Sequence, residues 1–189
     1  VTIGNFKGVI SYVAGDGNDV ALVPATVSLS IVGSPLAENA AGTIDFTFTR
    51  TGPTTDSITV TFSVDGTAKK VAGSDFSDNA TSLNDMTGTA SILSGQASVT
   101  VAVNPTDDNV VELDETLILT IQNGSAYNPV TGAGAAATGT ITDNDLATFT
   151  INSVSVAENA GTLDFTLSLS SPIDTAADVN VSFADVTTG

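Results

Sequence analysis

Short runs in which apolar and polar residues alternate strictly constrain the fold of this chain more than any other feature of its sequence. Residues 97–103 place Ala and three Val on one face and Ser, Thr and Ala on the other. Residues 115–121 place Leu117, Leu119 and Ile121 on one face. Because successive side chains of a strand point to opposite sides, this pattern is typical of strands with one buried face. No helical periodicity of useful length accompanies it, so the sequence predicts an all-β protein.

Seven such segments follow one another, separated by turn-forming residues: 26–31, 43–49, 57–64, 88–93, 97–103, 115–121 and one that ends at 139–141. Hydrophobic residues make up 41% of the chain and the mean hydropathy is +0.28, which is ample for a core. Seven short strands with turn signals between them favour a two-sheet sandwich. We therefore expect an immunoglobulin-like seven-stranded β-sandwich.

The segment 106–115 concentrates acidic residues between two of these predicted strands. It holds five carboxylates in ten residues, and Glu115 shares the inward face of the strand that follows. Two unit charges about 5 Å apart repel by roughly 3 kcal/mol at an effective dielectric of about 20. The chain has 21 acidic and only 4 basic residues to relieve this repulsion. A divalent cation would relieve it, so the segment predicts a metal site at one end of the sandwich.

Composition excludes several classes of partner. A net charge of −17 leaves no basic patch, which argues against nucleic acid as a partner. No apolar run is long enough to span a bilayer, so direct membrane insertion is not expected. The chain has no Cys, and a secreted protein without disulfides needs another stabilising element, such as bound calcium.

Composition also argues against an enzyme. The chain has no His and no Cys, which removes the commonest general base and the thiol nucleophile. Paired carboxylates can hydrolyse glycosides, but such sites need aromatic sugar platforms, and this chain has no Trp and two Tyr. We expect no catalytic activity.

An internal repeat divides the chain. Residues 37–47 recur as residues 157–166, which gives a period of about 120 residues. Residues 25–146 are predicted to form the complete sandwich, and residues 147–189 a second copy that stops after its third strand, near Val179–Phe183. Residues 1–24 read as a hairpin around the turn 14–19, either the tail of a preceding domain or a donor segment.

The partial second copy is predicted to expose an apolar face, formed by Leu163, Phe165, Leu167, Leu169, Val181 and Phe183. Such a face does not remain in water. Either the parent chain continues or a neighbouring molecule adds strands. The start at Val1 suggests a processed product or an excised fragment. Residues 1–24 of another copy are a candidate donor, and repeated donation would give a head-to-tail filament.

An ordered set of motifs across residues 26–146 resembles the Calx-beta domain, a module of sodium–calcium exchanger regulatory loops and of many large bacterial surface proteins. The motifs are Ala37-Glu38-Asn39, Asp65-Gly66-Thr67-Ala68, Gly73-Ser74-Asp75-Phe76, Ser94-Gly95-Gln96, Asp107-Asp108 with Glu112-x-x-Glu115, and Asp143-Asn144-Asp145. A partial copy of the same pattern follows in residues 147–189.

The resemblance implies a Ca²⁺ site at one end of the sandwich. The implied ligands are Glu38, Asp75, Asp107, Asp108, the backbone carbonyl of Val110, Glu112, Glu115, Asp143 and Asp145. Several carboxylates and a carbonyl suit Ca²⁺ better than Mg²⁺ or zinc. Asn144 stands where some members of the family carry an acid, which lowers the local charge.

These observations predict a calcium-binding structural or adhesion module of a large extracellular or cell-surface protein, in which Ca²⁺ rigidifies the sandwich end and the junction to the next repeat. Its partners would be neighbouring domains or other copies of the same protein. Two alternatives remain: the filament subunit described above, and a calcium-sensing regulatory module, which would bind the ion more tightly.

Overall fold

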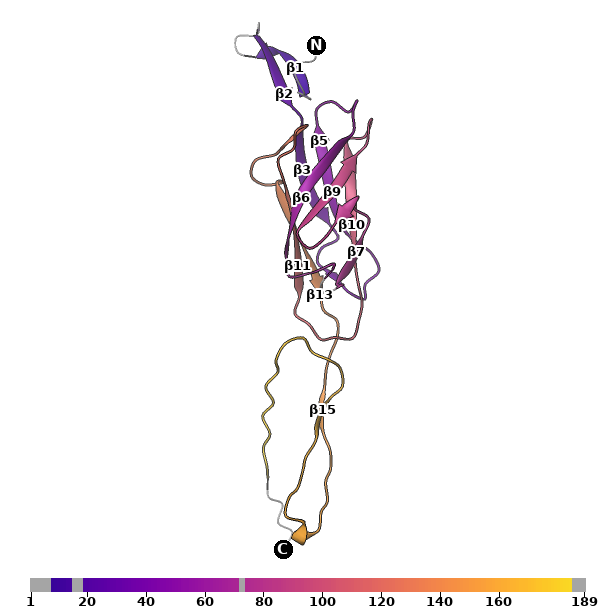
Figure 1. Ribbon diagram of the computed structural model, residues 1–189, viewed down its shortest axis with the longest axis vertical. Coiled ribbons are helices and arrows are strands. Elements are labelled where there is room, and N and C mark those ends of the chain that lie inside the picture. Colours follow the sequence, from indigo (N-terminus) through magenta and orange to yellow (C-terminus); the bar gives the residue numbers. More distant parts are fainter. Residues whose placement is uncertain (1–7, 15–18, 72–73, 185–189) are drawn as a thin grey trace. The chain divides into compact units, whose positions relative to one another are not determined.

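Strands form nearly all the regular structure in the computed structural model of this chain, which describes residues 8–14, 19–71 and 74–184 (Figure 1). Contacts divide the chain into two units. Unit 1 comprises residues 1–108 and 113–144, and unit 2 comprises residues 109–112 and 145–189. Among the described residues, none belongs to a helix long and apolar enough to cross a membrane.

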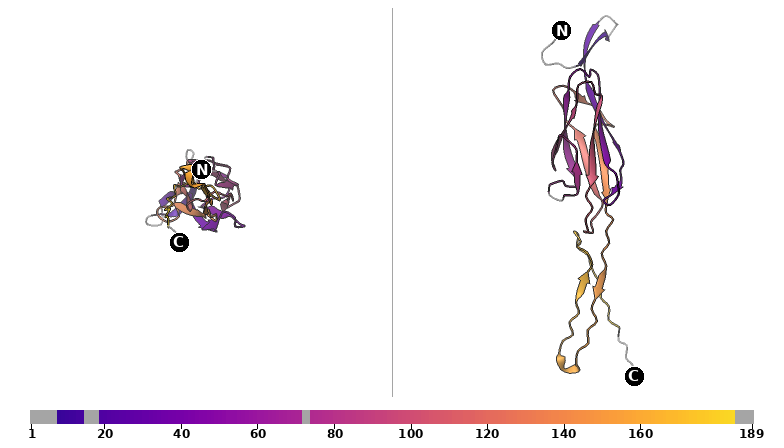
Figure 2. Two further views of the ribbon diagram at one scale, coloured as in Figure 1. Left: turned by 90° about the horizontal axis from the view of Figure 1, so that it is seen from below. Right: turned by 90° about the vertical axis from the view of Figure 1, so that its right-hand side faces the viewer.

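Unit 1 contains two large β-sheets whose strands run lengthwise through it (Figures 1 and 2). The first has the order β12 (Asn128–Pro129), β3 (Thr26–Val32), β5 (Ile44–Thr51), β10 (Ser98–Pro105) and β7 (Phe76–Asp78). The second has the order β4 (Leu36–Ala37), β13 (Ala136–Thr142), β11 (Glu115–Ile121), β6 (Ile58–Gly66), β9 (Thr87–Ile92) and β8 (Ser82–Leu83).

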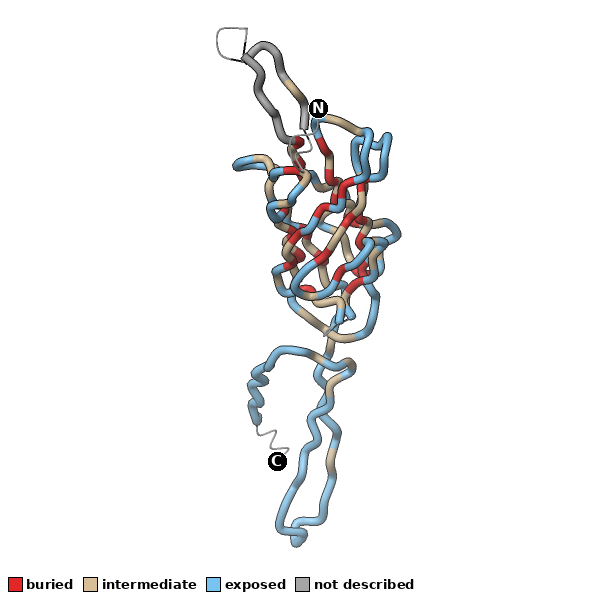
Figure 3. Tube along the Cα trace, turned by 45° about the horizontal axis from the view of Figure 1, so that its top comes forward, coloured by how far each residue is buried: buried red, intermediate tan, exposed pale blue. Residues whose placement is uncertain are grey.

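The core lies between these sheets and consists of the inward residues of the alternating pattern. The largest fully buried side chains are Phe46, Phe48, Phe62, Ile44, Ile92, Leu117, Leu119, Ile141, Val27, Val60, Val101 and Val103. The rings of Phe48 on β5 and Phe62 on β6 stack across the two sheets with centroids 5.1 Å apart. Figure 3 shows the buried positions concentrated in this unit. The predicted immunoglobulin-like sandwich is therefore confirmed.

All seven predicted strands are present, and four short strands extend them at the sheet edges. β7 and β8 lie in a segment that the sequence pattern did not mark as strand, between β6 and β9. They are only three and two residues long. Strands this short carry too few residues to show an alternating pattern, and they form because β10 and β9 offer an unpaired edge.

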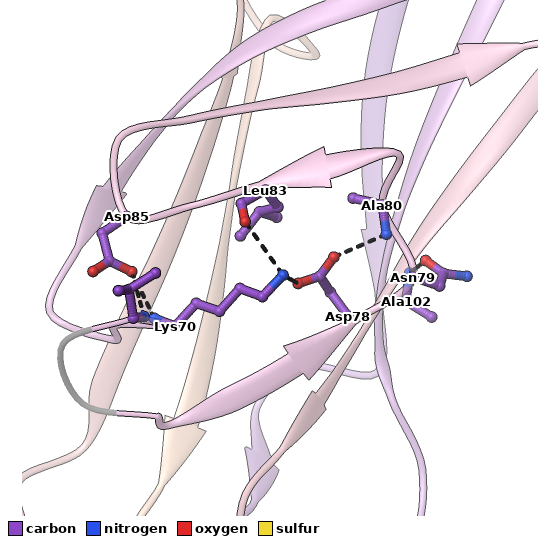
Figure 4. A network of polar contacts seen from close by, with 8 residues as sticks. Lys70, Asp78, Asn79, Ala80, Leu83, Asp85 and Ala102 are labelled. Carbon is purple, nitrogen blue, oxygen red and sulfur yellow. Dashed lines mark hydrogen bonds and ion pairs between the residues drawn. The ribbon is translucent and has the colours of Figure 1, made fainter.

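A partly buried ion pair holds this edge segment in place (Figure 4). The ammonium of Lys70 lies 2.6 Å from the carboxylate of Asp78, whose side chain is 1% exposed, and donates to the carbonyl of Leu83 at 3.2 Å. The same carboxylate accepts the N–H of Ala80 at 2.9 Å. Asp85 accepts the backbone N–H of Lys70 at 2.7 Å. These bonds link β7 and β8 to the chain that leaves β6.

A buried arginine organises the loops beyond the end of β5. Arg50 is 4% exposed, and its guanidinium donates to the backbone carbonyls of Gln96, Asp56, Thr54 and Leu93 at 2.6–3.2 Å. One side chain thus satisfies carbonyl groups from the β5–β6 turn and from the turn between β9 and β10.

The N-terminal segment forms the hairpin predicted from its sequence. β1 (Gly8–Ala14) pairs antiparallel with β2 (Asp19–Pro24), with a register shift between Ser11 and Ala14. The turn residues 15–18, and with them Asp16, lie outside the described residues.

Unit 2 contains little buried structure among its described residues. β14 (Phe149–Ile151) pairs antiparallel with β15 (Leu167–Leu169), and a single 3₁₀ turn, η1, spans Glu158–Ala160. The expectation of a third strand at residues 179–183 is wrong, because that segment is extended without strand pairing. A strand needs a partner, and no described residue pairs with this segment.

The apolar face predicted for the second repeat is exposed. Phe149 pairs with Leu169 and Ile151 with Leu167, so these side chains share one face. Phe165 is 44% exposed, whereas its counterpart in the first repeat, Phe46, is fully buried. The Phe165 and Phe183 rings contact each other with centroids 6.2 Å apart. Figure 3 shows this unit as mostly exposed.

Candidate metal centre

The pairing of β4 with β13 brings two acidic segments together that are about a hundred residues apart in the sequence. The two strands are parallel, with Leu36 opposite Ile141 and Ala37 opposite Thr142. The N–H of Glu38 donates to the carbonyl of Thr142 at 3.2 Å and extends the pairing by one step. Because parallel strands end at the same edge, the residues that follow them, Glu38 and Asp143, lie side by side.

A compact carboxylate group lies at this end of the sandwich, which we call the pole of unit 1. It is formed by Glu38, Asp143 and Asp145. Each contributes an oxygen, and these oxygens all lie within 4.8 Å of one another. Glu38 is 6% exposed, and Asp143 and Asp145 are partly buried. Oε2 of Glu38 and Oδ2 of Asp145 are shielded from water. Asp145 directly follows the last residue of unit 1, so its position follows from the chain that leaves β13.

Glu115 lies in the same sheet as β4 and β13, level with Leu36 and Ile141. It is the first residue of β11 and pairs with Ile141, the residue that also faces Leu36. Directly opposed residues point to the same face, and Ile141 is buried. Oε2 of Glu115 is likewise shielded from water. The structure therefore directs this carboxylate inward, as the alternating pattern predicted.

Three predicted ligands lie at the same pole in the other sheet, where β10 ends and β7 begins: Asp75, Asp107 and Asp108. Asp75 immediately precedes β7, and its backbone carbonyl accepts the N–H of Thr106, just beyond β10, at 2.9 Å. The carboxylate of Asp75 accepts the N–H of Lys69 at 2.5 Å. Asp107 and Asp108 follow β10 and are exposed. None of the three belongs to the compact group formed by described residues.

The remaining predicted ligands, Val110 and Glu112, belong to unit 2. The segment Asn109–Glu112 groups with the second repeat because Val111 makes a parallel bridge to Ile173. The N–H of Val111 donates to the carbonyl of Pro172 at 3.0 Å, and the N–H of Asp174 donates to the carbonyl of Val111 at 3.2 Å. Val110 and Glu112 are partly buried.

Each basic side chain in residues 19–71 and 74–184 makes a hydrogen bond or ion pair outside the compact carboxylate group. Arg50 donates to carbonyls beyond the far end of β5, Lys70 pairs with Asp78, and the ammonium of Lys69 donates to the carbonyl of Gly66 at 2.6 Å. Two carboxylates within 4.8 Å repel by on the order of 3 kcal/mol at an effective dielectric of about 20. A cation bound among the three carboxylates would offset this repulsion.

The donor set fits Ca²⁺. Calcium takes oxygen ligands at about 2.3–2.6 Å, so two ligands of one ion lie at most about 5 Å apart. The oxygens of Glu38, Asp143 and Asp145 meet this limit. All nine predicted ligands offer oxygen, and nitrogen or sulfur donors of the kind that zinc prefers are absent from this chain, which has no His and no Cys.

One residue of this pole has a role that the sequence pattern did not indicate. The sequence pattern indicates only that Asn144 lowers the local charge, but its Oδ1 accepts the N–H of Asn39 at 3.1 Å. A side-chain amide between two acids carries no signal of its own, because its partner lies 105 residues away.

Comparison with known protein families gives a match to one family. The family model described as Calx-beta domain matches residues 26–145 and again residues 141–189. No curated protein matches the chain.

Solved structures similar to the chain carry related names. The crystal structure of the apo form of the Calx CBD1 domain is 20% identical over 65% of this chain and 99% of that one, with a TM-score of 0.46. The structure of CBD12 from CALX1.2 is 21% identical over 66% of this chain and 49% of that one, with a TM-score of 0.46. The calcium binding domain CBD12 of CALX1.1 is 27% identical over 58% of this chain and 40% of that one, with a TM-score of 0.42.

Proposed function

This chain belongs to the Calx-beta domain family, and on that premise we propose that it is a non-catalytic module that binds Ca²⁺ at the pole of unit 1. The observation that carries the proposal is the compact group of Glu38, Asp143 and Asp145, whose oxygens lie within 4.8 Å of one another. Family membership and this group both support Ca²⁺ as the cofactor.

The ligands of the proposed site come from both sheets. Glu38, Asp143 and Asp145 would hold the first ion, and Glu115 reaches inward at the same level of the sheet. Asp75, Asp107, Asp108, Glu112 and the carbonyl of Val110 are proposed to complete the coordination, which for Ca²⁺ takes six to eight oxygens. Bound Ca²⁺ would neutralise the repulsion among these acids and join the loops that carry them.

The proposed role is to stiffen the sandwich end and the junction to the next repeat. The chain passes between the two units three times, after Asp108, after Glu112 and after Asn144. A proposed ligand lies at each of these crossings, and Asp145 is the first residue beyond the third. Ca²⁺ coordination would therefore restrict the same segments through which the units are connected. Adhesion and an extracellular or cell-surface location are part of this proposal.

Calcium titration tests the proposal. Calorimetry on the whole chain should give a dissociation constant of about 10⁻⁴ to 10⁻³ M, as in extracellular modules, whereas a sensor would bind at about 10⁻⁷ to 10⁻⁵ M. Glu38→Gln should weaken binding at least tenfold, because it removes a buried charged ligand. Glu158→Gln is the matched control, since Glu158 is the exposed counterpart of Glu38 in the second repeat. Equal affinity of both variants would reject the site.

A second candidate function, a subunit of a filament built by strand addition, is favoured by the exposed apolar face of unit 2. Phe149, Ile151 and Phe165 are each more than 40% exposed on this face. Strands from another copy would widen the β14–β15 pair and, packed against its apolar face as a second layer, would cover that face. Light scattering decides between the candidates: a mass that grows with concentration supports the filament, and a strictly monomeric chain rejects it.

A further inference from the structure

The side chain of Asn144 joins the two acidic segments of the proposed site. Its Oδ1 accepts the N–H of Asn39 at 3.1 Å. Asn144 lies between Asp143 and Asp145, and Asn39 directly follows Glu38. This one hydrogen bond therefore connects the backbone on both sides of the compact carboxylate group.

The bond completes a series that fixes the turn after β4. The N–H of Glu38 donates to the carbonyl of Thr142 at 3.2 Å, and the N–H of Ala40 donates to the carbonyl of Ala37 at 3.0 Å. The N–H of Asn39 lies between these two donors and takes the amide oxygen of Asn144. Three consecutive N–H groups of the turn thus have fixed acceptors, and the backbone that carries Glu38 has little freedom.

An amide suits this position better than a carboxylate would in the absence of metal. The acceptor oxygen is neutral, so it binds the N–H of Asn39 without adding a further negative charge between Asp143 and Asp145. A third acid in that segment would increase the repulsion within the group before an ion arrives.

We infer that Asn144 is a positioning residue, whose amide oxygen holds the Asn39 backbone and thereby keeps Glu38 close to Asp143 and Asp145 before Ca²⁺ binds. This inference rests on the proposed function. Segments already held in their bound geometry lose less conformational entropy on binding, so preorganisation increases affinity. Without the bond, the pairing of β4 with β13 still joins the two segments, but the turn that carries Glu38 must be ordered when the ion binds.

The test compares Asn144→Ala and Asn144→Asp with the wild-type chain. Asn144→Ala should bind Ca²⁺ about three- to tenfold more weakly, the loss expected for one exposed hydrogen bond that orders a loop. Asn144→Asp keeps an acceptor oxygen and adds a charge, so its affinity should equal or exceed that of the wild type. Asn123→Ala, in an exposed position of the β11–β12 loop, is the control and should bind as the wild type does.

Hydrogen exchange of the Asn39 amide, measured without calcium, provides a readout independent of binding. The amide should exchange at least several-fold faster in Asn144→Ala than in the wild type, and Asn144→Asp should restore part of the protection, because its oxygen is an acceptor while its charge adds repulsion. Wild-type affinity in Asn144→Ala, or an unchanged exchange rate at Asn39, would overturn the inference while leaving the calcium site intact. Absence of calcium binding in the wild-type chain would instead overturn the proposed function, and the inference with it.

Discussion

At the scale of single residues, the two ends of the sandwich concentrate charges of opposite sign: one end buries a cation, and the other brings carboxylates together. Near the end of β5, the cation Arg50 is buried among backbone carbonyls, which are the negative ends of peptide dipoles. At the other pole, the carboxylates of Glu38, Asp143 and Asp145 lie close together and repel one another. The chain thus supplies its own positive charge at one end and is proposed to take a metal ion at the other.

Replacing Arg50 should destabilise unit 1 strongly. Arg50→Met removes the donors of four hydrogen bonds and leaves buried carbonyls without partners, so the free energy of unfolding should fall by about 3 kcal/mol. Arg50→Lys should recover part of this loss, because an ammonium has three donors but lacks the planar fork. Urea denaturation measures both. A change below about 1 kcal/mol in Arg50→Met would show that water replaces the guanidinium.

Tyr127 should make the chain sensitive to alkaline pH. Burial raises the pKa of Tyr127 above 10.0, while the hydrogen bond from the N–H of Thr61, at 2.9 Å, partly opposes the shift. The unfolded state therefore ionises first, and the stability contributed by the neutral phenol is lost as pH rises from about 10 through the folded-state pKa. The melting temperature of Tyr127→Phe should depend less on pH in this range. Identical alkaline profiles for both proteins would contradict the prediction.

Residue patterns predicted some of the site and could not predict the rest. The inward direction of Glu115 follows from its spacing to Leu117 along one strand, which is a local property of the sequence. The proximity of Glu38 to Asp143 depends on the parallel pairing of β4 with β13, which joins distant parts of the chain and leaves no local pattern. Arg50 continues the inward series of Phe46 and Phe48, so its burial was open to prediction from the same alternation.

At the scale of elements, the length of a strand decides whether the sequence pattern can predict it. Strands of six or more residues show the alternation that predicted them, whereas β4 and β8 have two residues each and depend on neighbours for their existence. The segment 179–183 shows the opposite case. It alternates like a strand, but pairing requires a neighbour as well as a pattern, and the described part of unit 2 provides none.

The edge segment that contains β7 and β8 should depend on the Lys70–Asp78 pair. Lys70→Met leaves the buried carboxylate without its cation and should lower stability by about 2–3 kcal/mol. Adding Asp78→Asn removes the uncompensated charge, so the double variant should be more stable than Lys70→Met alone. Lys69→Met, which loses only a hydrogen bond to a carbonyl, should cost about 1 kcal/mol or less. Additive effects of the two substitutions would show that the pair is not coupled.

At the scale of the whole molecule, the net charge and the exposed apolar residues have opposite effects on association between copies. Unit 1 has a continuous core between two sheets, while the apolar residues of the described part of unit 2 remain substantially exposed. Net charge of −17 opposes close association of copies at low salt, whereas the exposed face of unit 2 favours it. Calcium would change this balance, because each bound ion cancels two negative charges.

Calcium should stabilise unit 1 as a whole. At a concentration 100 times the dissociation constant, one site adds about 2.7 kcal/mol to the free energy of unfolding. The melting temperature of the chain should then rise by about 5–10 °C, and a chelator should reverse the rise. Asp143→Asn should abolish most of this shift, while Glu158→Gln should retain it. An increase of equal size in both variants would place calcium elsewhere.

Hydrogen exchange along the chain should separate the two units and decide how the second is completed. With few buried contacts, the amides of residues 149–184 should exchange nearly as fast as those of an unfolded chain, while β5, β6 and β11 should exchange slowly. Calcium should slow exchange at residues 36–40 and 142–145, where the proposed ligands lie. If strands from another copy cover Phe149, Ile151 and Phe165, protection of β14 and β15 should increase with protein concentration. Protection that is strong and independent of concentration would contradict the exposed face, since it would require unit 2 to form a core by itself.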